Sequence, residues 1–288
     1  MEIRDWLILQ VLLEQKNITK TAHALYISQP ALTARLRQIE DEFGIRIVDR
    51  GSKGVHFTPQ GEYLARRAAD VIAQFRDISE QVKDMSDNVA GRLRLGASNY
   101  FTQYQLPRLL KMFKLRYPKV EFQVTTAWSQ QVVSMVHNHT IHVGFVRGDY
   151  GWQDEKCLLF EETMCIASAE EIDLSILPRL PKIEYQTDPR IKIIMDDWWR
   201  ENFSGPPYVS MTVNHVDTCK SMVLNGLGWA ILPSAILNDT AHLHKVNLKD
   251  KAGRPLTRRT WMFYQNAALQ SSMVRSFIDF VKDMRFPG

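Results

Sequence analysis

Residues 19–33 read Thr-Lys-Thr-Ala-His-Ala-Leu-Tyr-Ile-Ser-Gln-Pro-Ala-Leu-Thr, and this stretch decides the fold of the amino-terminal third of the chain. Thr19 is a suitable N-cap for a short helix, and the chain turns at Tyr26. Ser28 can cap a second helix, whose first turn tolerates Pro30 because that position needs no backbone N–H. Two short helices joined by a tight turn are typical of the helix-turn-helix, whose second helix enters the major groove of DNA.

The neighbouring segments complete a small domain. Apolar residues at i, i+3, i+4 and i+8 predict a helix before this unit, with Ile3, Trp6, Leu7 and Val11 on its buried face. The second helix of the unit buries Leu32, Leu36, Ile39 and Phe43, and Gly44 is a natural stop. Short strands at 45–48 and 55–57, joined by the turn 51–54, predict a small hairpin that follows as a wing.

Charge distribution favours DNA as the partner of this unit. The segment 15–39 contains four Lys or Arg residues and no Asp or Glu, so it can face phosphates. Gln29 and Thr33, at the start of the second helix, can reach base edges, and Arg50 and Lys53 lie on the wing. An alternative is a helical interaction domain whose basic residues are merely solvated. The candidate DNA-binding residues are Lys20, Ser28, Gln29, Pro30, Thr33, Arg35, Arg37, Arg50 and Lys53.

A long helix opens at Thr58-Pro59 and carries a heptad pattern. Its apolar residues alternate steps of four and three: Leu64, Ala68, Val71, Phe75, Ile78, Val82 and Met85. A period of 3.5 residues is that of a two-stranded coiled coil, with an ordinary amphipathic helix as the alternative. The polar segment 86–91 ends in glycine and predicts a hinge.

Beyond the hinge the pattern alternates between strands and helices. Strands are predicted at 93–97, 120–125 and 141–146, with helices between them. This alternation predicts a mostly parallel α/β sheet, and the remaining length of about 200 residues suits one domain or two lobes.

Composition and motifs exclude several other classes. The 288 residues are 45% hydrophobic and 24% charged with a net charge of +4, an ordinary globular balance. The three cysteines form no CxxC pair, and no apolar run is long enough to span a membrane or serve as a signal peptide, so we expect a cytoplasmic protein. The histidines at 137, 139 and 142 lack the further ligands of a metal site, and no nucleophile motif or complete dinucleotide fingerprint occurs. We therefore expect neither an enzyme nor a bound metal or cofactor.

The chain resembles the LysR-type transcriptional regulators. The match comprises residues 19–33, Ile39-Glu40, Phe43-Gly44, Arg50, Phe57-Thr58-Pro59-Gln60-Gly61 and the glycine-rich stretch Gly226-Leu227-Gly228-Trp229-Ala230-Ile231-Leu232-Pro233.

This resemblance implies a multidomain fold. It places a winged helix-turn-helix DNA-binding domain at 1–58, a dimerising linker helix and hinge at 59–90, and a two-lobed α/β effector domain like a periplasmic binding protein at 91–288. Lobe I is expected at about 91–162 and 266–288, and lobe II at about 163–265.

The resemblance also implies an effector site in the cleft between the lobes. Arg147 can pair with a carboxylate in a bidentate manner, and Arg258 or its neighbour Arg259 offers a second cation. The helix starts near Ser98 and Ser129 offer backbone N–H groups, although plain helix caps and surface ion pairs are the alternatives. The candidate effector-binding residues are Ser98, Asn99, Tyr100, Trp128, Ser129, Gln130, Arg147 and Arg258.

More narrowly, the effector domain resembles the citrate-responsive catabolite control regulators of Gram-positive bacteria. The matching pieces are Trp128-Ser129, Val146-Arg147-Gly148, Asp197-Trp198-Trp199, Asp217-Thr218-Cys219-Lys220 and Arg258. In those relatives the equivalents of Arg147 and Arg258 bind citrate, which implies citrate or another small carboxylate as the effector here. Asn99 and Tyr100 depart from the small or aliphatic residues expected there, so the pocket volume should differ.

The sequence thus predicts a DNA-binding regulator that controls metabolic genes. Its expected partners are a double-stranded operator, a small carboxylate and further copies of itself, as a homodimer or homotetramer. The alternatives are a two-lobed small-molecule-binding protein or enzyme that does not bind DNA, and a helical adaptor whose coiled coil recruits proteins.

Overall fold

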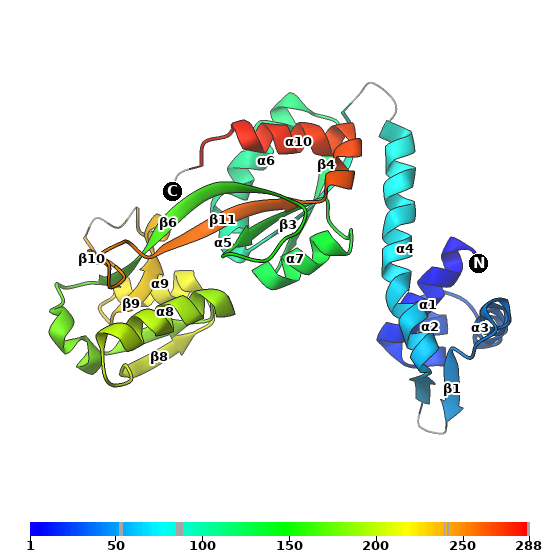
Figure 1. The fold of residues 1–288 in the computed structure, drawn as a ribbon, viewed down its shortest axis with the longest axis horizontal. Coiled ribbons are helices and arrows are strands. Elements are labelled where there is room, and N and C mark those ends of the chain that lie inside the picture. Colours follow the sequence, from blue (N-terminus) through cyan, green and yellow to red (C-terminus); the bar gives the residue numbers. More distant parts are fainter. Residues whose placement is uncertain (52–53, 85–88, 239, 241, 287–288) are drawn as a thin grey trace.

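The structure is a computed structural model that describes residues 1–51, 54–84, 89–238, 240 and 242–286. Figure 1 shows the amino-terminal helices gathered around one end of the long helix α4, and an α/β part with two lobes that share the strands β6 and β11. The predicted architecture of a helix-turn-helix, a linker helix and a two-lobed α/β domain is confirmed.

The amino-terminal domain consists of α1 (Ile3–Gln15), α2 (Ile18–Ala24), α3 (Gln29–Phe43), β1 (Val48–Gly51) and β2 (Gly54–Phe57). Ser28 caps α3 as predicted, because its hydroxyl accepts a backbone hydrogen bond of 3.3 Å. The predicted cap at Thr19 is wrong: Asn17 caps α2, accepting from Lys20 N at 2.9 Å. The helix therefore begins one residue before Thr19.

The core of this domain joins α1 and α3 to the start of α4 (Pro59–Asp84). Its fully buried residues include Ile8, Leu9, Leu12, Leu32, Leu36, Ile39 and Ala68. Gly61 permits the close packing of α4, since a Cβ there would lie 2.1 Å from the carbonyl oxygen of Ile47. The first wing strand begins at Val48 rather than Ile45, because Ile47 N donates to the Glu40 carboxylate at 2.8 Å.

The heptad positions of α4 divide into two environments. Leu64 and Ala68 are buried against the amino-terminal domain. Phe75, Ile78 and Val82 are 53%, 59% and 61% exposed, a large exposure for apolar side chains that share one helix face. The amino-terminal half of the pattern thus holds α4 to its own domain, and the other half is open to a partner helix. Met85 and residues 86–88 of the predicted hinge 86–91 lie outside the described residues.

Lobe I is a mixed sheet with helices on both faces. It contains β3 (Gly91–Ala97), α5 (Asn99–Tyr104), α6 (Leu106–Arg116), β4 (Val120–Thr126), α7 (Ser129–His137), β5 (Val143–Arg147), β11 (Thr257–Tyr264), η3 (Asn266–Gln270) and α10 (Ser272–Asp283). Strand β3 is parallel to β4 and β5, whereas β11 is antiparallel to β5. Helices α6 and α10 cover one face of the sheet and α7 the other (Figure 1). The last five residues of β11, Thr260–Tyr264, pair with β5, so this part of β11 belongs to the sheet of lobe I.

Lobe II is built on the far half of β6 (Glu155–Ser168). It adds η1 (Leu174–Arg179), β7 (Lys182–Tyr185), α8 (Pro189–Asn202), β8 (Val209–Val213), α9 (Val216–Leu224), β9 (Ala230–Pro233), η2 (Ser234–Leu237) and β10 (His244–Asn247). Strands β9, β10 and β11 all pair with β6 in antiparallel fashion, so the prediction of a mostly parallel sheet is wrong. The reason is the connection between the lobes: the chain leaves lobe I in β6 and returns in β11, which runs the opposite way.

We predict that replacing both Phe75 and Ile78 with Asp dissociates the protein into monomers. Two like charges on each helix would face those of the partner across an apolar seam and repel them. Sedimentation velocity of the full chain measures the outcome. Tyr63→Asp is the matched control, because Tyr63 is 64% exposed but lies outside the heptad positions. Equal sedimentation of the double variant and the wild type would contradict a seam on this face.

Candidate DNA-binding surface and ligand cleft

The amino-terminal end of α3 forms an exposed polar surface. Ser28, Gln29 and Pro30 are exposed, and Thr33 is half-buried one turn later. Thr19 at the start of α2 donates to Gln29 Oε1 at 3.2 Å, which ties the two helices together. This arrangement leaves the end of α3 free to enter a groove of DNA, as expected of the second helix of such a unit.

Tyr26, in the turn between α2 and α3, is a feature that the sequence interpretation missed. It has a φ of +55°, uncommon for a residue with a side chain, and it is 95% exposed. A large aromatic ring held in solvent beside Ser28 and Gln29 is a further candidate DNA contact. The tight turn was its only signal in the sequence, since backbone handedness cannot be read from a tyrosine.

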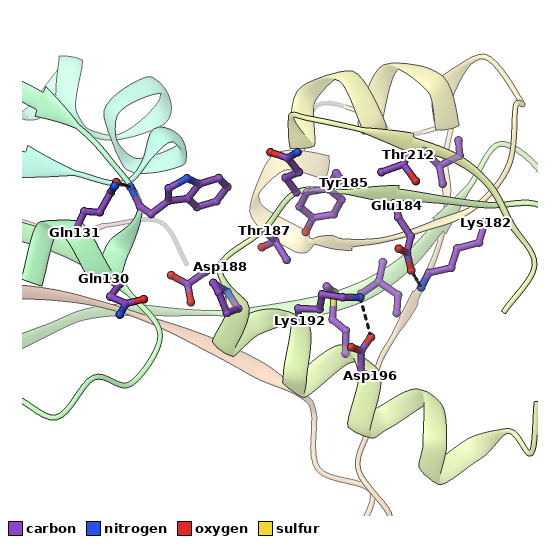
Figure 2. A pocket seen from close by; sticks show the side chains of 16 residues that line it. Gln130, Gln131, Lys182, Glu184, Tyr185, Thr187, Asp188, Lys192, Asp196 and Thr212 are labelled. Atoms are coloured by element: carbon purple, nitrogen blue, oxygen red, sulfur yellow. Dashed lines mark hydrogen bonds and ion pairs between the residues drawn. The ribbon is translucent and has the colours of Figure 1, made fainter. Parts of the chain in front are cut away.

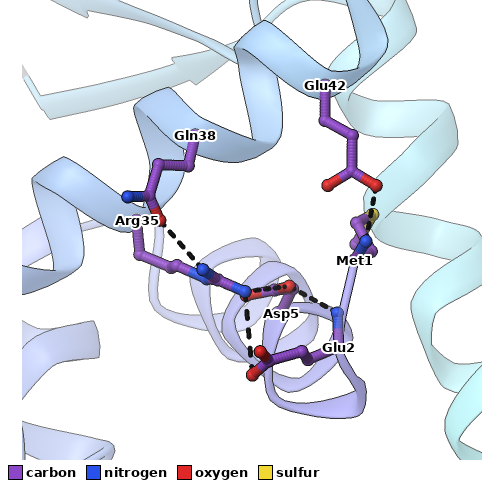
Figure 3. Close-up of polar contacts among 6 residues, drawn as sticks. All are labelled: Met1, Glu2, Asp5, Arg35, Gln38 and Glu42. Carbon is purple, nitrogen blue, oxygen red and sulfur yellow. Dashed lines mark hydrogen bonds and ion pairs between the residues drawn. The ribbon is translucent and has the colours of Figure 1, made fainter.

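Arg35 is partly exposed and forms an ion pair within its own domain. Its guanidinium donates two hydrogen bonds to the Asp5 carboxylate, from Nε to Oδ1 at 2.5 Å and from Nη2 to Oδ2 at 2.8 Å (Figure 3). Its Nη1 also donates to Gln38 at 2.9 Å. Asp5 is 1% exposed, so this pair fixes α3 on α1. Burial tends to raise the pKa of Asp5, but the hydrogen bonds from Arg35 and from Glu2 N outweigh it and hold the pKa below its usual range. The sequence interpretation missed this ion pair, and the phosphate contact at Arg35 stays a prediction.

Of the other basic residues predicted to contact DNA, the structure describes the side chains of two. Lys20 and Arg37 are exposed and remain candidates for phosphate contacts. The side chain of Arg50 and the whole of Lys53 lie outside the described residues.

A cavity of about 570 Å³ lies between the two lobes. The predicted effector residues Ser98, Asn99, Tyr100, Trp128, Ser129, Arg147 and Arg258 all line it. Lobe II contributes residues from the end of β7 and the starts of α8 and α9. Gln130 faces an adjoining cavity of about 540 Å³ instead.

Figure 2 shows this adjoining cavity, with Gln130 and Gln131 on the lobe I side and the residues of β7 and α8 opposite them. Its two lysines are each paired with a carboxylate. Lys182 Nζ lies 2.7 Å from Glu184, and Lys192 Nζ lies 3.3 Å from Asp196. Each lysine of this cavity therefore has a carboxylate of its own, whereas the two arginines of the first cavity share one, Glu162.

The two arginines of the 570 Å³ cavity share one buried carboxylate. Oε1 of Glu162 accepts from Arg147 Nη2, and from Arg258 Nε at 3.1 Å and Nη2 at 2.9 Å. The Glu162 side chain has no exposed area. Sequence interpretation missed this residue, although strand periodicity offered a signal: Glu162 shares a face of β6 with the buried Phe160 and Met164.

The cluster of Arg147, Glu162 and Arg258 is buried and has unused polar atoms. Burial lowers the pKa of Arg147 to about 9, which leaves its guanidinium charged at neutral pH, and the Tyr100 ring lies 3.7 Å from it. Among the described residues, Arg147 Nε, Glu162 Oε2 and the Ser98 hydroxyl are buried without a hydrogen-bond partner. Such atoms are rare in folded proteins, and here they lie in the wall of one cavity (Arg147 and Ser98) or behind it (Glu162). Ser129 Oγ accepts from Arg147 N at 3.1 Å and still has a hydrogen to donate.

Two tyrosine–aspartate contacts join the lobes at the cleft. Tyr104 of α5 donates to Asp217 of α9. Tyr150, which follows β5, donates to Asp188 at the start of α8 at 2.6 Å. Both aspartates line the 570 Å³ cavity, so the lobes touch at its polar rim.

In the part of the chain that the structure describes, no group of three His, Cys, Asp or Glu side chains could hold a metal ion, and no helix is long and apolar enough to cross a membrane. Burial raises the pKa of Cys165 to about 11 and that of Cys219 to about 12, so these thiols are poor nucleophiles at neutral pH.

Comparisons with known proteins agree over the whole chain. Residues 3–62 match the family of bacterial regulatory helix-turn-helix proteins of the lysR family, and residues 86–285 match the LysR substrate binding domain. The Bacillus subtilis uncharacterized HTH-type transcriptional regulators YraN and YkuM are similar, at 39% and 31% identity, over 98% and 99% of this chain and 98% of each relative. The fold is like that of CbnR, a LysR family transcriptional regulator, with a TM-score of 0.68 at 16% identity over 98% of both chains. CbnR in complex with its target DNA gives a TM-score of 0.67, at 16% identity over 98% of this chain and 99% of that one.

We predict that Arg35→Ala lowers the free energy of unfolding by about 1–3 kcal/mol, because a buried carboxylate loses its partner. The folded-state pKa of Asp5 is depressed, so this contribution is present above the unfolded pKa of about 3.9 and is lost as the pH falls through the folded value. Urea titrations at pH 7 and at acid pH measure it. Arg37→Ala is the control on the same helix, and it should leave stability unchanged. Equal stability of the two variants at pH 7 would contradict the structural role of Arg35.

Proposed function

Because the chain belongs to the LysR family of transcriptional regulators, we propose that it binds its operator as a homodimer or homotetramer and that a small carboxylate, citrate being the first candidate, modulates this binding. The genes under its control are metabolic genes, as expected of a carboxylate sensor. The family and its relatives are regulators rather than enzymes.

DNA recognition rests on the exposed end of α3. A single recognition helix reads only a few base pairs, so two copies related by a two-fold axis are needed for an inverted repeat. The exposed face of α4 at Phe75, Ile78 and Val82 supports such a pairing.

The buried pair of arginines at the cavity wall is the observation that carries the effector proposal. Arg147 and Arg258 line the cavity, and each guanidinium can receive a carboxylate in a bidentate manner. The partnerless Arg147 Nε and Ser98 hydroxyl supply further donors, and the hydrogen of Ser129 Oγ is free to join them. A small polycarboxylate satisfies all of these groups at once, whereas an apolar ligand would leave them buried and unpaired.

We predict that Gln29→Ala weakens specific DNA binding by about 1–3 kcal/mol and leaves binding to random duplex nearly unchanged, because Gln29 reads a base edge. Lys20→Ala should weaken both and lower the salt dependence by about one unit, as a phosphate contact does. Fluorescence anisotropy with the DNA upstream of the protein's own gene and with a random duplex measures both affinities. An equal loss on both duplexes for Gln29→Ala would mean that α3 lies on DNA differently.

We predict that citrate at about 100 times its Kd raises the free energy of unfolding by about 2.7 kcal/mol, measured as a higher Tm. Arg147→Ala should remove this shift together with the DNA response, and Arg147→Lys, which keeps the charge but not the planar fork, should weaken it. Arg259→Ala is the control, because Arg259 is an exposed neighbour that pairs with Glu161 at 2.6 Å. Calorimetry that finds no citrate binding at millimolar concentration, or unchanged binding in Arg147→Ala, refutes the assignment. Another carboxylate that depends on both arginines would keep the site and change only the ligand.

A further inference from the structure

Glu162 is the one member of the cluster that does not line the cavity. Arg147 and Arg258 form part of the cavity wall, and Glu162 lies behind them with no exposed area. An anion that enters the cavity therefore meets two guanidiniums whose positive charge is already partly neutralised by the Glu162 carboxylate behind them. The three side chains together carry a net charge of +1.

The rest of this cavity does not supply the missing positive charge. Among the described residues that line it there is no lysine, and the other charged side chains are Asp188 and Asp217. The titratable neighbours are Tyr100 of α5, Tyr185 of β7 and His215 before α9. Burial raises the pKa of both tyrosines, so they stay neutral throughout the physiological range.

A polycarboxylate would thus bring excess negative charge into a buried site. Citrate carries roughly three negative charges at neutral pH, since ordinary carboxyl groups ionise near pH 4. When its carboxylates take up hydrogen bonds from Arg147 and Arg258, the Glu162 carboxylate loses part of its own stabilisation. Burial and like charge then both favour the neutral form of Glu162.

Building on the proposed function, we propose that anion binding at Arg147 and Arg258 takes up one proton from solvent and that Glu162 accepts it. The proton joins Oε2, the buried oxygen that has no partner, and no other covalent bond forms or breaks. Oε1 continues to accept from the arginines, so they stay in place. Because the bound state holds the extra proton, effector affinity rises as the pH falls. Glu162 thereby determines which ligand charge the site accepts and in which pH range the protein responds to the ligand.

The number of protons taken up on binding can be measured by calorimetry of citrate binding to the full chain at pH 6, 7 and 8. Each titration is run in two buffers of different ionisation enthalpy, because the difference in binding heat between the buffers gives the number of protons. Citrate titrates too, so the informative quantity is the difference between the wild type and Glu162→Gln, which keeps the shape but not the charge. We expect the wild type to take up about one proton more. We also expect Glu162→Gln to bind at least about tenfold more tightly at pH 8, with the two affinities converging toward pH 6.

Three further variants make the result specific. Glu161→Gln is the matched control on the exposed face of the same strand and should behave as the wild type. Glu162→Asp keeps the carboxylate and should retain the proton uptake, which separates charge from packing. His215→Gln should also retain it, and loss of uptake there instead of in Glu162→Gln would overturn the inference.

The outcomes distinguish this inference from the proposed function. Citrate binding with equal proton uptake in the wild type and Glu162→Gln overturns the role of Glu162 and leaves the ligand proposal intact. No citrate binding by either protein, with both folded by their melting curves, overturns the ligand proposal and this inference with it.

Discussion

The arrangement of the effector domain depends on three buried charges at the place where the chain crosses between its lobes. Glu162 lies on β6, and the two arginines that share its Oε1 lie on β5 and β11. An ion buried without a partner costs several kcal/mol, so each charge is tolerated only beside the others. The cluster therefore fixes adjacent strands against one another and presents two oriented guanidiniums to the cleft.

Local signals in the sequence were sufficient for most of the fold. Ser28 and Gly44 bound α3 because capping and left-handed backbone depend on single residues. The sheet was harder to predict, because strand direction depends on where the chain crosses between lobes. The antiparallel pairing of β6 with β9 and β11 joins residues that are 63 to 109 positions apart along the chain, and no local pattern specifies it.

The site residues show the same division. Seven predicted effector residues line one cavity: five of them follow the ends of β3 and β4, and Arg147 is the last residue of β5, positions that a strand–helix pattern locates. Arg258, the second residue of β11, was predicted from the family resemblance instead. The ion pair of Arg35 and the presence of Glu162 at the site were both missed. Each depends on a partner far away in the sequence: Asp5, 30 residues from Arg35, and Arg258, 96 residues from Glu162. A charged residue on a helix or strand looks solvated in the sequence until its buried counter-ion is known. Tyr100, which departs from the expected small residue, proves to be the ring that packs on Arg147.

Helix α7 gives the cleft and the linker helix a common element. Its first residue, Ser129, lines the cavity and accepts from Arg147 N. Just beyond its other end, His139 O accepts a hydrogen bond of 3.0 Å from Arg76 of α4. A helix moves nearly as a rigid body because its backbone is hydrogen-bonded along its length. Helix α7 therefore connects the cavity to α4, and α4 packs against α1, which in turn contacts the recognition helix α3.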